Sequence, residues 1–63
     1  MKTMFIVELE EGVWLADGIG DPSRTLDMDD AKRFKWRSKA KYALLIARKY
    51  RPFLNAKIIE VDS

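Results

Sequence analysis

The sequence predicts a single α+β domain spanning residues 1–63, in which helices pack on one face of a small sheet. Three observations lead to this prediction. Apolar and polar residues alternate near the start of the chain and again near its end, as in strands. Between these segments, residues 39–51 repeat apolar side chains with a helical period. A chain of 63 residues has room for one domain with a small core.

A β-hairpin opens the predicted fold. Residues 4–10 alternate as a strand, and residues 13–16 resume the strand pattern. Glu11-Gly12 between them is a tight-turn signal, because glycine tolerates positive φ. The Gly and Pro content of residues 17–23 predicts a loop. Residues 24–26 can form only a brief extended segment after it.

A short helix is predicted next. Asp27 is placed to cap it, because its carboxylate can accept hydrogen bonds from free backbone amides. Asp29 and Asp30 suit the positive end of the helix dipole. We expect this helix to include Ala31 and Phe34.

The main helix is expected over residues 39–51, with Ser38 as its cap and Pro52 as its stop signal. Several apolar side chains fall on one side of this helix at about 100° per residue. They are Ala40, Ala43, Leu44, Ile46, Ala47 and Tyr50. The three alanines among them predict a helix that lies close to the sheet.

Residues 57–61 predict a closing strand beside the first one, parallel or antiparallel to it, which gives a three-stranded sheet. We expect one sheet face to meet the helices. It would carry Phe5, Val7, Leu9, Leu15, Ile59 and Val61. The opposite face would carry Ile6, Trp14 and Ile58. It is a candidate homodimer surface, unless Met1, Met4 or residues 52–54 cover it.

Charge is distributed unevenly along the chain. Residues 31–57 contain ten Lys and Arg side chains and no Asp or Glu, whereas residues 1–30 contain eight acids and only Lys2 and Arg24. The formal net charge of +2 therefore conceals a strong electrical asymmetry, which can orient a charged partner.

The acid-free segment is the candidate binding site. Cations with interspersed aromatic rings are typical of nucleic-acid binding, because cations meet phosphates and a ring can stack on an unpaired base. The candidate residues are Lys35, Trp36, Arg37, Lys41, Tyr42, Leu45, Arg48 and Lys49. The alternative is a solvated lysine-rich helix with Trp36 in the core. Beside Tyr42, Leu45 can instead anchor a protein partner.

Other function classes are less favoured. The chain has no His and no Cys, so it lacks the usual general base, the commonest metal ligand and thiol chemistry. Its aspartates do not follow the spacing of a calcium loop, and 18–20 lacks the lysine of a phosphate-binding loop. We expect no catalysis, metal, cofactor, small-molecule substrate or membrane contact, and a cytoplasmic location.

Several packing residues resemble those of small accessory proteins of phage and prophage type. The shared features are a short hairpin, a Thr-Leu-Asp step at 25–27, Ala31-x-x-Phe34, an Ala-rich helix and an Asn-Ala-Lys-Ile-Ile-Glu-Val ending. The resemblance implies the fold and a mobile-element setting, and it implies no active-site residue. Two functions follow as expectations: a nucleic-acid or nucleoprotein binding module, or a protein-binding inhibitor of a host protein, anti-CRISPR proteins included. A helix-turn-helix is disfavoured by the short first helix.

Overall fold

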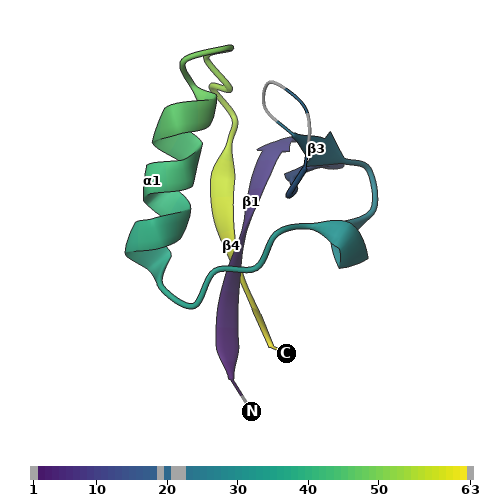
Figure 1. Ribbon diagram of the computed structural model, residues 1–63, viewed down its shortest axis with the longest axis vertical. Coiled ribbons are helices and arrows are strands. Elements are labelled where there is room, and N and C mark those ends of the chain that lie inside the picture. The colour runs from purple at the N-terminus through teal and green to yellow at the C-terminus, as the bar shows by residue number, and fades with distance from the viewer. Residues whose placement is uncertain (1, 19, 21–22, 63) are drawn as a thin grey trace.

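The computed structural model describes residues 2–18, 20 and 23–62, which form a four-stranded antiparallel sheet with one α-helix (Figure 1). The elements in chain order are β1 (Thr3–Glu10), β2 (Val13–Leu15), β3 (Arg24–Thr25), the 3₁₀ turn η1 (Met28–Asp30), α1 (Arg37–Ala47) and β4 (Lys57–Asp62). The strand order is β3-β2-β1-β4. The α+β class is confirmed, whereas the predictions of three strands and two helices are wrong in detail.

The predicted hairpin is formed by β1 and β2. Glu10 lies opposite Val13 and Glu8 lies opposite Trp14, with an irregularity in the register between them. Gly12 takes a φ of 76° in the connecting turn, which is the conformation that favours glycine there. The hairpin prediction is therefore confirmed.

The fourth strand comes from the brief extended segment after the loop. Leu15 lies opposite Arg24 and Trp14 lies opposite Thr25, so β3 extends the sheet beyond β2. The amide of Ala16 donates to the carbonyl of Ser23 at 2.9 Å, where the chain returns from the expected loop. Within that loop, residues 19, 21 and 22 lie outside the described residues.

The predicted first helix is only a 3₁₀ turn. Asp27 does cap it, since its Oδ1 accepts from the Asp29 amide at 2.9 Å. Ala31, however, is already extended, and Phe34 pairs with Phe5 of β1 through two backbone hydrogen bonds of 2.8 Å. A helix continuing to Phe34 would lose that pairing with the sheet, so the chain leaves helical geometry after Asp30.

The main helix begins and ends earlier than predicted. Its N-cap is Trp36, whose carbonyl accepts from the amides of Lys39 and Ala40 at 3.1 and 3.2 Å, and no side chain caps it. Ser38 is therefore inside the first turn and is not the cap. At the other end, the chain tightens after Ala47 into a turn over 48–50, before Pro52 is reached.

The closing strand lies antiparallel to β1, and its register corrects the predicted faces. Val7 lies opposite Ile58 and Ile6 lies opposite Ile59. Because directly opposed residues share a face, Ile58 packs toward α1 with Val7, while Ile59 and Val61 point to the other face with Ile6. The expected positions of these three β4 side chains are thus reversed.

The core lies between α1 and the sheet. Its buried members are Val7, Leu9, Leu15, Ala40, Leu44, Ala47 and Phe53. Two members of the predicted helix stripe lie outside it: Ile46 is 39% exposed and Tyr50 is 55% exposed. Tyr50 follows the end of α1, so the helical phase no longer applies to it. Ile46 lies on a flank of the helix, next to a notch that it lines with Phe34 and Ala16.

Replacing Ala40 with Glu should unfold most of the protein. Ala40 is 0% exposed at the contact between α1 and the sheet, so the substitution places extra volume and an unpaired charge in the core. An uncompensated buried charge costs about 3–5 kcal/mol, a large share of the stability of a small domain. Thermal and urea melts measure the effect. The matched control is Tyr42→Glu on the exposed side of α1, and equal melts for the two variants would contradict this packing.

Candidate anionic-partner interface

Three of the ten cations in residues 31–57 are paired with acids from the first part of the chain. Lys32 Nζ lies 2.8 Å from Asp17 Oδ1. The other two pairs join residues after α1 to β1, namely Arg51 to Glu10 at 3.7 Å and Lys57 to Glu8 at 3.6 Å. These contacts hold the segments around α1 against the hairpin, so their charges are neutralised locally.

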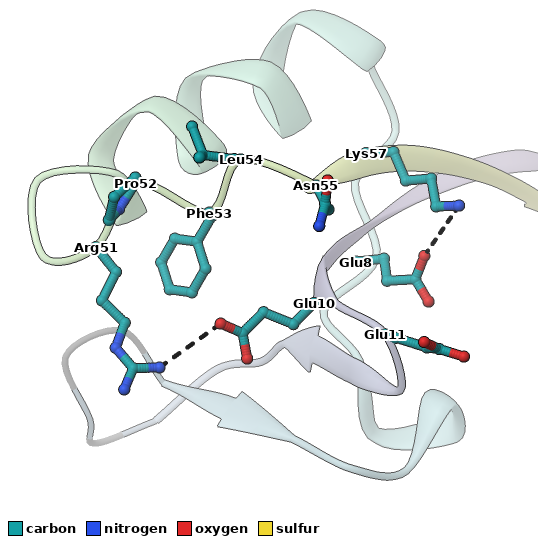
Figure 2. Close-up of a pocket in the computed structure, with 9 residues that line it drawn as sticks. All are labelled: Glu8, Glu10, Glu11, Arg51, Pro52, Phe53, Leu54, Asn55 and Lys57. Carbon is teal, nitrogen blue, oxygen red and sulfur yellow. Dashed lines mark ion pairs between the residues drawn. The ribbon is translucent and has the colours of Figure 1, made fainter.

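Two of these ion pairs border a broad hollow of about 1110 Å³ between the end of the hairpin and the chain over 51–57 (Figure 2). Figure 2 shows the Arg51 and Glu10 side chains meeting on one side and the Lys57 and Glu8 side chains meeting on the other. Phe53 also lines the hollow and is buried in the core, with a left-handed φ of 46°. Since its cations and carboxylates are largely matched, this hollow is a weaker candidate for charged ligands than the helix surface.

The seven remaining cations have no carboxylate within ion-pair distance among the described residues. They are Arg33, Lys35, Arg37, Lys39, Lys41, Arg48 and Lys49. All seven side chains are exposed, and all lie on α1 or on the chain immediately beside it. Unpaired charges of one sign on a continuous surface produce a positive potential that attracts anions.

Three of these cations form a row along the side of α1 that faces β4. Arg37, Lys41 and Arg48 are spaced by four and seven residues, so the helical period places them on one side. With residues of the β4 edge they border a groove of about 440 Å³, which we call the α1–β4 groove. Its apolar lining comes from Leu44, Leu45, Ala56 and Ile58.

The guanidinium of Arg37 is held in place at one end of this groove. Its Cζ lies 5.0 Å from the centre of the Phe5 ring, which is within the range of a cation–π contact. This contact restricts the motion of the guanidinium. The guanidinium has no carboxylate partner among the described residues. A positioned cation is better able to recognise an anion than a freely moving one, because less side-chain entropy is lost on binding.

Tyr42 lies on the side of α1 directed away from the sheet, Leu45 lies between that side and the α1–β4 groove, and Lys49 follows the end of the helix. Tyr42 is 63% exposed and Leu45 is 61% exposed, next to the exposed Lys49. The predicted placement of these side chains outside the core is confirmed. Together they give the helix surface a mixed apolar and cationic character.

Lys35 and Trp36 precede the helix rather than lie on it. Trp36 is 64% exposed, so the alternative in which its indole is buried in the core is wrong. Its backbone begins α1 while its ring remains available to solvent. The structure thus separates the predicted site residues into three neighbouring groups: the entry to α1, the row beside β4, and the outward side of the helix.

Sequence reasoning did not find the contribution of β4 to this surface. Ala56 and Ile58 line the α1–β4 groove, yet Ile58 was expected on the opposite sheet face. Two adjacent isoleucines at 58 and 59 make either alternation equally consistent with the sequence. Only the pairing of Val7 with Ile58 decides between them.

Across residues 2–18, 20 and 23–62, no three His, Cys, Asp or Glu side chains lie together in a way that could hold a metal ion. In the same part of the chain, α1 and the rest of the fold include no helix with the length and apolar character needed to cross a bilayer.

Comparisons with protein-family models, with curated proteins and with solved structures find no match for this chain.

Proposed function

We propose that this protein is a small non-catalytic binding module whose basic α1 surface docks on nucleic acid. The observation that carries the proposal is the group of seven exposed cations without a carboxylate partner among the described residues. Surface helices usually mix charges of both signs, whereas α1 contains cations only. A surface of this kind gains free energy by releasing the counterions condensed on a phosphate backbone.

The exposed aromatic side chains favour nucleic acid over other polyanions. Trp36 adjoins Lys35 and Arg37 in the chain, so cations flank a large, accessible ring. A phosphate backbone beside unpaired bases offers partners for both kinds of group. A polyanion without bases offers a partner for the cations alone.

Binding to a single-stranded oligonucleotide should weaken steeply with salt. Each phosphate contact contributes about −0.7 to the slope of log affinity against log salt on single strands. Lys49→Glu should weaken binding and make the slope shallower by about 0.7. Lys49 is exposed and outside the core, so the variant should keep its melting temperature. Fluorescence anisotropy over a salt series measures both quantities.

The control for this experiment is Lys2→Glu, which changes the net charge by the same amount at an exposed site at the start of the chain. It should leave the slope nearly unchanged if the contacts are local to α1. Equal losses for the two variants would mean that only net charge matters, and absence of binding to DNA and RNA even at low salt would contradict the proposed function.

Trp36→Ala should weaken binding to single strands by roughly 1–3 kcal/mol and binding to duplex DNA much less, because a ring can stack only on an unpaired base. The indole is exposed, so the free energy of unfolding should change by no more than about 0.5 kcal/mol. Titrations of both oligonucleotides with wild type and variant give the comparison. An equal loss on single and double strands would show that Trp36 does not stack.

A protein partner is the second candidate, and the exposure of Leu45 and Tyr42 is the observation that favours it. A tyrosine ring beside cations is typical of a binding hot spot, and the exposed leucine next to it adds apolar surface that phosphates cannot use. This function would match a protein-binding accessory factor, such as an inhibitor of a host protein. In that case Leu45→Ala should reduce binding as much as loss of the lysines.

A further inference from the structure

Among the described strands, β4 presents the longest backbone edge that no other strand covers. The edge strand β3 has only two residues, and short edge strands offer little to pair with. Beyond β2, the remaining edge of β1 is bridged by Phe34. The strand at the other end of the sheet, β4, has six residues and pairs only with β1 among the described strands.

The direction of the β4 backbone groups follows from Phe5. Its N–H and C=O both bond to Phe34, on the edge of β1 opposite β4. Phe5 and its partner Glu60 therefore form a pair without mutual hydrogen bonds, and such pairs alternate with bonded ones along an antiparallel ladder. The backbone N–H and C=O of Ile58, Glu60 and Asp62 consequently point away from β1, toward the free edge.

The side chains of these residues form a row beside the α1–β4 groove. Ile58, Glu60 and Asp62 are spaced by two, so all three lie on the α1 side of the sheet. The groove combines apolar residues with the cations Lys41 and Arg48, which have no carboxylate partner among the described residues. An extended strand with an apolar residue followed by two acids would complement it, and β4 itself has that pattern.

We propose that a second copy of this chain pairs with the free edge, β4 against β4, in an antiparallel arrangement that makes one eight-stranded sheet. For the two β4 strands to hydrogen-bond, residues whose backbone N–H and C=O point to the free edge must lie directly opposite one another. Pairing Glu60 with Glu60 would place like charges directly opposite, and pairing Ile58 with Ile58 would use only the start of the strand. A register without these two faults has Ile58 opposite Glu60 of the partner subunit.

This register has two consequences. Ile59 lies opposite Ile59 of the partner subunit on the two-fold axis, as an apolar pair on the sheet face away from α1. On the α1 side, Glu60 of the partner subunit comes beside Ile58, and Asp62 of the partner subunit comes beside Ala56. Ile58 and Ala56 line the groove together with Lys41 and Arg48. The two acids of the partner subunit therefore come close to these two cations.

The dimer and the proposed nucleic-acid function share part of one surface, because Lys41 and Arg48 line the groove. Lys35, Trp36 and Lys49 do not line the groove, and they remain exposed when a second copy occupies it. The two-fold axis is perpendicular to the sheet, so the α1 helices of the two copies lie on the same face of the eight-stranded sheet. Loss of the dimer can be measured without nucleic acid, so the failure of one proposal is distinguishable from the failure of the other.

A single-cysteine variant tests the register. The chain has no cysteine, so Ile59→Cys provides one thiol per copy. Directly opposed residues in an antiparallel pair are close enough for a disulfide. We expect mild oxidation with copper phenanthroline to convert most of Ile59→Cys to a covalent dimer. Val61→Cys, on the same strand and face, should cross-link at least tenfold more slowly, because it lies opposite Lys57 of the partner subunit.

Charge-reversal variants test the contact between Glu60 and Lys41 across the dimer without introducing a cysteine. Sedimentation equilibrium should show wild type shifting toward twice the monomer mass as concentration rises. Glu60→Lys and Lys41→Glu should each weaken dimerisation at least tenfold, and the double variant should recover most of the loss. Both residues are exposed, so the folds should survive. A wild type that stays monomeric at high concentration, equal cross-linking at 59 and 61, or no recovery in the double variant would overturn the proposal.

Discussion

The close approach of α1 to the sheet is the contact on which the rest of the structure depends. Ala40 and Ala47 are 0% and 1% exposed, and their small side chains let the helix backbone lie near β1, while Leu44 and Phe53 fill the space around them. In a domain of 63 residues this layer contains most of the apolar core. The packing fixes the rotation of α1 about its axis, and that rotation decides which side chains face solvent.

The charge distribution follows from this rotation. With alanines against the sheet, the long cationic side chains of α1 must project sideways or outward. Among the described residues, acids of the first part of the chain pair with Lys32, Arg51 and Lys57. The sequence asymmetry between acidic and basic segments thus becomes a spatial one. Cations near the hairpin are balanced by acids, whereas those on α1 have no carboxylate partner among the described residues.

The features that could be predicted from the sequence are those set by local patterns. Gly12 marked the turn of the hairpin, Asp27 marked a cap, and the alanine spacing identified the buried side of α1. The errors arose where distant contacts decide. Pairing of Phe34 with Phe5 ended the first helix early, and pairing of Val7 with Ile58 selected the face of β4. Neither contact leaves a signal within its own segment.

The central claim is that an anionic partner contacts the exposed surface of α1 and the chain entering it. The most direct test is to follow the backbone amide signals of the ¹⁵N-labelled protein by NMR while a single-stranded oligonucleotide is added. We expect the largest shifts over residues 33–49, with the amides of β2 and β3 little affected. Shifts concentrated in the hairpin and β3, with α1 unchanged, would contradict it.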